Sequence, residues 1–145
     1  MASPERRDLL ELIGPLSRSL RRVEERCAKD AGLSMWQYAV LSAASRHEGQ
    51  SQTQIADRLG YSRNRIINDL DVLQERGLAE RRSGPDRRRY LIHVTPSGRA
   101  TATEVRDAIW AAEDALLAHL PAAARESLQG LLEQALAPPT DRIDV

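Results

Sequence analysis

The feature that most constrains the fold is the stretch of residues 51–98, in which capping residues, glycines and turn-forming residues mark where successive elements begin and end. Ser51 followed by Gln54 forms a capping box, which predicts a short helix that ends at Gly60. Ser62 is then a plausible N-cap for a second helix, directly after the glycine turn. The stretch therefore begins as helix, turn and helix.

The second helix of this stretch is predicted to carry different chemistry on its two faces. Ile66, Leu70 and Leu73 recur at helical spacing and form an apolar stripe that packs inward. The opposite face is polar and suits phosphates and base edges if the helix lies in a major groove. The candidate DNA-binding residues here are Ser62, Arg63, Asn64, Arg65 and Asn68, and Asp69 shares the polar face. Of these, Arg65 and Asn68 are expected to read base edges.

A hairpin is predicted after the second helix, which ends at Gly77. Residues 78–82 and 90–94 have strand-like patterns, and the turn-forming residues 83–86 separate them. Basic residues follow the turn. By itself such a charge run is usually a solvated turn, but the neighbouring helix-turn-helix favours contact with DNA. The candidate DNA-binding residues of the hairpin are Asp86, Arg87, Arg88 and Arg89.

Three segments of this stretch carry a family resemblance. DRRRYLIHVTPSG fits the pattern D-x-R, five residues, an apolar residue and T-x-x-G, and IADRLG and LDVLQERGLAER accompany it. Together they resemble the MarR family of winged helix-turn-helix regulators. Val94 stands where leucine is usual, and Asn68 stands where the family often has arginine. Arg88 is similar to the family's wing arginine, which enters the minor groove, and Asp86 could hold its side chain.

The resemblance implies a mainly α fold with a small β-hairpin wing. It implies a winged helix-turn-helix DNA-binding domain at residues 34–98 and a helical dimerisation region formed by 1–30 and 105–145. It further implies a homodimeric transcriptional repressor that binds a palindromic operator in double-stranded DNA. A small-molecule effector that releases the protein from DNA is an additional partner that the resemblance leaves open. We expect no cofactor.

The flanking segments are predicted to be helices with long apolar stripes. Gly14 and Pro15 interrupt the first stripe, which predicts either a short helix followed by a longer one or a single kinked helix. After the hairpin, Thr95 and Pro96 open a helix expected to run to about Leu120, and Pro121 opens another. Such stripes need a partner, which favours a two-fold dimer.

The charge of the chain is unevenly distributed, although the net charge is zero. Residues 1–50 carry a net charge of +1, residues 51–100 carry +4, and residues 101–145 carry −5. The basic excess therefore lies on the segment predicted to contact DNA. No apolar stretch approaches the length of a membrane span, and we expect a cytoplasmic protein.

Cysteine and histidine offer alternative sites. Cys27 could sense oxidants, but it lies on an apolar stripe without a clear basic cluster, so we interpret it as a core residue. His47, His93 and His119 do not have the spacing of metal ligands, and we predict no metal site.

Trp36 and Trp110 are the candidates for an effector pocket. The resemblance places such a pocket where the dimerisation helices meet the DNA-binding domain, and both residues fall on helices that border this junction. Ordinary core packing is the alternative, because aromatic side chains are common in cores.

Two other functions compete with DNA binding. An enzyme is disfavoured because the sequence lacks a Gly-rich phosphate loop, a G-x-S-x-G elbow and an H-E-x-x-H motif. A winged helix used for protein contact would carry an apolar centre where Arg63, Arg65, Arg87 and Arg88 are predicted. The sequence therefore favours a DNA-binding regulator.

Overall fold

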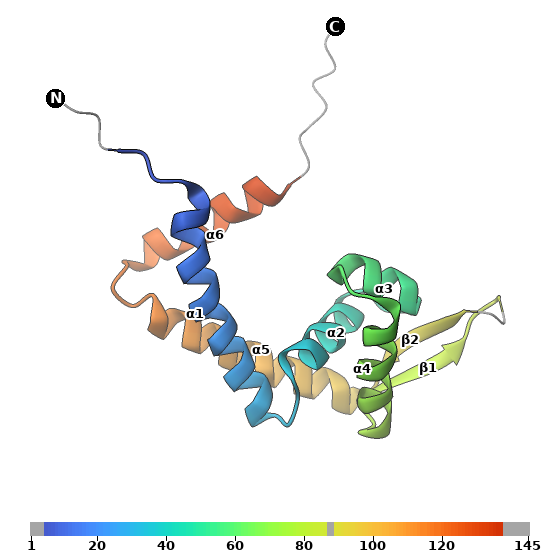
Figure 1. Cartoon of the computed structure of the whole chain (residues 1–145). Coiled ribbons are helices and arrows are strands. Elements are labelled where there is room, and N and C mark those ends of the chain that lie inside the picture. Colours follow the sequence, from blue (N-terminus) through green and yellow to red (C-terminus); the bar gives the residue numbers. More distant parts are fainter. Residues whose placement is uncertain (1–4, 87–88, 138–145) are drawn as a thin grey trace, which may run out of the picture.

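The structure is a computed structural model and describes residues 5–86 and 89–137. Six helices and one two-stranded antiparallel sheet follow one another along this part of the chain, as the sequence predicted (Figure 1). The elements are α1 (Leu9–Asp30), α2 (Met35–Arg46), α3 (Gln52–Leu59), α4 (Arg63–Glu75), β1 (Ala79–Ser83), β2 (Tyr90–Val94), α5 (Pro96–Leu116) and α6 (Ala122–Leu136).

The predicted capping residues start the helices of the helix-turn-helix. The Ser51 hydroxyl accepts from the Gln54 N–H at 3.2 Å, and the Ser51 N–H donates to the Gln54 side chain at 2.9 Å. α3 ends at Gly60, whose φ of 66° lies in the left-handed region that favours glycine. The Ser62 hydroxyl then accepts from the Arg65 N–H at 3.3 Å and caps α4.

The hairpin is fixed to the segment before α3 by backbone hydrogen bonds. β1 and β2 pair in antiparallel register from Ala79 opposite Val94 to Ser83 opposite Tyr90. The Ile92 N–H donates to the Gln50 carbonyl at 2.8 Å, which ties β2 to the residues before α3. These bonds orient the hairpin relative to the helix-turn-helix.

Helix α5 leaves the hairpin through a tight junction. The Thr95 hydroxyl accepts from the Gly98 N–H at 3.0 Å and donates to the Gly77 carbonyl at 2.7 Å. Gly98 lies so close to β1 that a Cβ atom there would overlap the Leu78 carbonyl. Only glycine therefore fits at this point of the first turn of α5.

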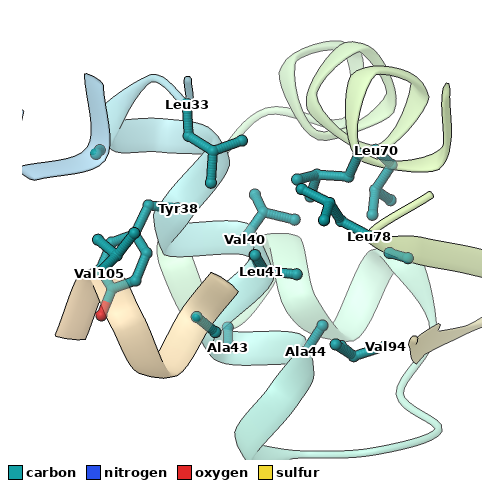
Figure 2. Close-up of a cluster of buried hydrophobic side chains, with 14 of the residues drawn as sticks. Leu33, Tyr38, Val40, Leu41, Ala43, Ala44, Leu70, Leu78, Val94 and Val105 are labelled. Carbon is teal, nitrogen blue, oxygen red and sulfur yellow. The ribbon is translucent and has the colours of Figure 1, made fainter. Parts of the chain in front are cut away.

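The core lies where α2, α4, the hairpin and the start of α5 meet (Figure 2). Figure 2 shows Tyr38 of α2 beside Val105 of α5, and Leu70 of α4 near Leu78. The apolar stripe predicted for α4 is confirmed. Its three residues Ile66, Leu70 and Leu73 are among the most deeply buried side chains of the described part.

Two details of the flanking helices differ from simple sequence rules. α1 is one continuous helix through Pro15, not two helices. Proline leaves the Glu11 carbonyl without its usual donor, but both residues are exposed, so water can replace that hydrogen bond. α5 ends at Leu116, about one turn before the expected Leu120, because residues 117–119 form a turn ahead of Pro121.

Helix α5 runs from the base of the hairpin to the other end of the molecule, α1 packs along it, and α6 lies away from the hairpin (Figure 1). None of the residues of α6 is buried. Several large apolar side chains of these helices are exposed in the single chain: Leu9, Leu10, Leu12, Ile13, Trp110, Leu116, Leu131, Leu132 and Leu136.

One side chain joins the end of α1 to the end of α4. The guanidinium of Arg76 donates to the Gly32 carbonyl at 2.7 Å and to the Ala31 carbonyl at 3.2 Å. These carbonyls follow the last turn of α1, where backbone acceptors lack partners within the helix. The C-terminal ends of α1 and α4 are therefore held together.

Among the helices that the structure describes, none combines the length and the apolar character that crossing a membrane requires.

Candidate nucleic-acid interface

Helix α4 presents a polar face to solvent. Arg63, Asn64, Arg65 and Asn68 are all exposed, as predicted, and Ser62 is exposed at the N-cap. Among the described residues, no side chain of these four donates a hydrogen bond to another part of the protein. Their donors are therefore free to bind a ligand that approaches this face.

Arg65 is nevertheless held in place by aromatic rings. Its guanidinium carbon lies 4.1 Å from the ring centroid of Trp36 and 5.6 Å from that of Tyr61. The two rings meet edge to face, with centroids 5.1 Å apart and planes at 72°. Such cation–π contacts stabilise a cation over the negative face of a ring.

Asp69 differs from the prediction, because it is half-buried and not part of the exposed face. Its Oδ2 atom is buried and has no hydrogen-bond partner within the described part of the chain. Burial raises the pKa of the Asp69 carboxyl, and the positive charge of Arg65 opposes this shift only in part. Asp69 therefore lies on the side of α4 that turns towards the protein.

Arg81 of β1 connects the hairpin to both helices of the helix-turn-helix. Its guanidinium donates to the Gln52 side chain at 2.7 Å, to the Ile67 carbonyl at 3.0 Å and to the Gln74 side chain at 3.3 Å. It also lies 2.7 Å from the carboxylate of Asp71. Sequence reasoning missed this role, because the partners lie 7 to 29 residues away along the chain.

The predicted residues of the hairpin turn are only partly described. Asp86 and Arg89 are exposed, and the Arg89 N–H donates to the Asp86 carbonyl at 3.0 Å. Arg87 and Arg88 lie outside the described residues, and so does the expected contact between Asp86 and Arg88. Strands β1 and β2 project from the end of the molecule away from α6 (Figure 1).

The two tryptophans do not line one common cavity. Trp36 is half-buried at the start of α2 and contacts Tyr61 and Arg65, as described above. Trp110 is 54% exposed and lines a cavity of about 590 Å³ between α1, α5 and α6. Trp36 is absent from the lining of that cavity.

The Trp110 cavity has apolar walls with charged groups at its edge. Leu16 and Leu132 contribute to its apolar lining, and Asp114 and Arg125 are among its charged lining residues. Glu113 also lines it, and burial raises the pKa of this carboxyl, with smaller contributions from the charges of Glu24 and Asp114. The cavity could accept an apolar molecule or an apolar segment of another chain.

The remaining candidates are Cys27 and the histidines, of which His47 and His119 are exposed. Cys27 is buried in the core, as predicted. His93 lies 3.5 Å from the carboxylate of Glu48, which also pairs with Arg99. In the ranges that the structure describes, no group of three or more acidic, histidine or cysteine side chains is placed to hold a metal ion.

Three comparisons with known proteins agree with this geometry. A family profile described as MarR family matches residues 31–89. A protein of Thauera aromatica, named for the transcriptional regulation of the hcr operon, is 32% identical over 104 residues, which are 71% of this chain. The chain spans 63% of the length of that relative.

Solved structures extend the similarity over most of the chain. The transcriptional repressor CouR bound to a 23-mer DNA duplex is 28% identical, with a TM-score of 0.78 over 90% of this chain and 93% of CouR. CouR from Rhodococcus jostii RHA1 bound to p-coumaroyl-CoA is 24% identical, with a TM-score of 0.76 over 92% of this chain and 94% of that chain. Residues 31–89 thus match the MarR family, and the capped helix-turn-helix with its β-hairpin has the fold of the MarR-family structures that the chain resembles.

Proposed function

We propose that the protein is a sequence-specific regulator of transcription that binds double-stranded DNA as a homodimer and acts as a repressor. The observation that carries this proposal is the exposed polar face of α4, whose donors are unused within the described part of the chain. Arginine and asparagine at such positions match phosphates and base edges of a major groove. The DNA-bound relative supports the same assignment.

The charge and chemistry of this face favour DNA over a protein partner. Apart from Ile67, the exposed side chains of α4 are polar. The centre of a protein interface is usually apolar and depleted of charge. The excess of basic residues in 51–100 would also attract the phosphate backbone. Such a regulator would act in the cytoplasm and needs no catalytic site.

The dimer is proposed from the exposed apolar side chains of α1 and α6. Leu10 and Leu136 are among the most exposed large apolar residues, and none of the residues of α6 is buried in the single chain. A second copy would cover such faces by two-fold symmetry, and would place two α4 helices about one turn of DNA apart on a palindromic operator. The dimerisation region would then comprise residues 1–30 and 105–145, and the DNA-binding domain residues 34–98.

A small-molecule effector is proposed as the regulator of binding. The Trp110 cavity lies among the helices proposed to dimerise, and the ligand-bound relative supports effector binding in a protein of this fold. A ligand that prefers a dimer with DNA-incompetent spacing would lower operator affinity by its differential affinity for the two states.

One experiment tests both the DNA and the dimer. Purified protein is offered a random pool of duplex DNA, the bound fragments are sequenced, and the mass of the free protein is measured by light scattering at micromolar concentration. We expect enrichment of a palindromic sequence and the mass of a dimer. A failure to retain any duplex would refute DNA binding, and a stable monomer would refute the dimer.

A further inference from the structure

Arg65 does not lie at the centre of the exposed face of α4. With 3.6 residues per turn, Asn64 and Asn68 lie roughly 160° from the middle of the buried stripe, whereas Arg65 lies only about 110° from it. The side chain therefore leaves the helix at its flank, on the side of α2. The contact with Trp36 confirms this direction, because Trp36 is the second residue of α2.

The aromatic contacts hold the guanidinium of Arg65 without using its N–H donors in hydrogen bonds. In the part of the chain that the structure describes, the Arg65 side chain donates no hydrogen bond and forms no ion pair. Arg81 shows the opposite arrangement, since its three nitrogen atoms all donate to protein acceptors. Arg81 is therefore used for the fold, and Arg65 is positioned but has its donors available.

We propose that Trp36 and Tyr61 are positioning residues that hold Arg65 at the flank of α4, where it binds a backbone phosphate of the DNA rather than a base. This inference rests on the proposed DNA binding. A planar guanidinium whose N–H donors are unused suits the paired oxygens of a phosphate. The nearby N-terminus of α2 adds positive potential at the same flank.

The proposed role of Arg65 differs from the one expected from the sequence. The sequence predicts that Arg65 and Asn68 both read bases. Their different angular positions around α4, and the contact of Arg65 with Trp36, give the two residues different roles. Asn64 and Asn68 remain centred on the exposed face and are the residues suited to base edges. Arg65 would set the position of the helix on the duplex without carrying sequence information.

The test measures binding to the duplex that wild-type protein selects from a random pool, together with its single-base variants. Fluorescence anisotropy at several salt concentrations gives the affinity of each protein variant for each duplex, and the slope of log affinity against log salt concentration (the salt slope). The protein variants are Arg65→Ala, Trp36→Ala, Trp36→Phe and the double variant Trp36→Ala with Arg65→Ala. Asn68→Ala is the matched control for a base-reading residue on the same helix.

We expect Arg65→Ala to weaken binding to all duplexes alike and to reduce the salt slope by about 0.9 for each phosphate that the side chain no longer neutralises. Trp36→Ala should weaken binding by roughly threefold to tenfold, the size of a cation–π contact. It should have little further effect when Arg65 is already alanine, and Trp36→Phe should restore most of the affinity. Asn68→Ala should instead relax the preference at one base pair of each half-site.

Two results would overturn the inference. One is a changed base preference in Arg65→Ala with an unchanged salt slope, which would make Arg65 a base reader. The other is an undiminished effect of Trp36→Ala in the Arg65→Ala background, which would make Trp36 purely structural. If Trp36→Ala damages the fold in general, it will weaken binding equally in the wild-type and the Arg65→Ala backgrounds. That outcome is the second result and counts against the inference. If the wild type selects no duplex, the proposed function fails as well; if it does, only the role of Arg65 is at stake.

Discussion

Replacing Arg81 with methionine should destabilise the protein, because it removes the links between the hairpin and the helix-turn-helix. The Arg81 side chain is only 16% exposed, and it donates to Gln52, Ile67 and Gln74. Hydrogen bonds from a charged donor contribute about 1.5–3 kcal/mol each, but exposed acceptors regain water. The ion pair with Asp71 adds little, since that side chain is 61% exposed. We therefore expect a loss of about 2–4 kcal/mol in the free energy of unfolding.

Urea denaturation of Arg81→Met and of wild type, at equal protein concentration, measures this loss. With a slope of about 2 kcal/mol per molar urea, the midpoint should fall by roughly 1–2 M. The control is Arg82→Met on the same strand, because Glu80 is the only partner of Arg82 among the described residues and both side chains are more than half exposed. Its effect should stay below about 1 kcal/mol. If the two variants unfold at the same urea concentration, the reasoning about Arg81 is wrong.

Three further changes test other parts of the structure. Gly98→Ala should lower the free energy of unfolding by about 3 kcal/mol or more, because its methyl group would overlap the Leu78 carbonyl, whereas Gly130→Ala on the open side of α6 should be neutral or stabilising in the same urea assay. Cys27→Ser should cost about 1–2 kcal/mol of stability by placing a hydroxyl in the core, yet leave DNA affinity unchanged before and after mild peroxide; release of wild type alone by peroxide would make Cys27 a sensor. Because burial raises the pKa of Asp69, the folded state is favoured while the carboxyl is protonated, and this advantage is lost as the pH rises through the raised pKa. Asp69→Asn should therefore raise the urea midpoint at about pH 7, a gain that should vanish near pH 3, where wild type is protonated in both states.

Local signals were sufficient to predict the helices and the hairpin. Ser51, Ser62 and Thr95 each supply a hydroxyl that accepts from a nearby N–H, so the start of each helix depends only on residues within one turn. The left-handed conformation of Gly60 likewise follows from the residue itself. At Pro15 the local rule allowed either two helices or one, and the structure has one helix, because water can replace the missing hydrogen bond on an exposed turn.

The candidate site could be predicted only in part. Which residues of α4 are exposed followed from the spacing of its buried residues, and this agrees with the structure for Arg63, Asn64 and Asn68. The surroundings of Arg65 did not follow, since Trp36 is 29 residues away and only the packing of α2 against α4 brings the two together. No pattern along the chain encodes such a contact. The placement of Trp36 and Trp110 in different surroundings is likewise a result of helix packing.

The two hydrogen bonds from Arg76 to the residues that follow α1 couple the orientation of α1 to that of α4. The 22 residues of α1 span about 33 Å, and Arg76 fixes the end that lies beside α4. A rotation of α4 by about 5° that carries α1 with it would move the far end of α1 by roughly 3 Å. The far end carries the exposed residues Leu9 to Ile13. In the proposed dimer, a small change of angle at α4 would thus become a displacement large enough to require a different packing of those side chains.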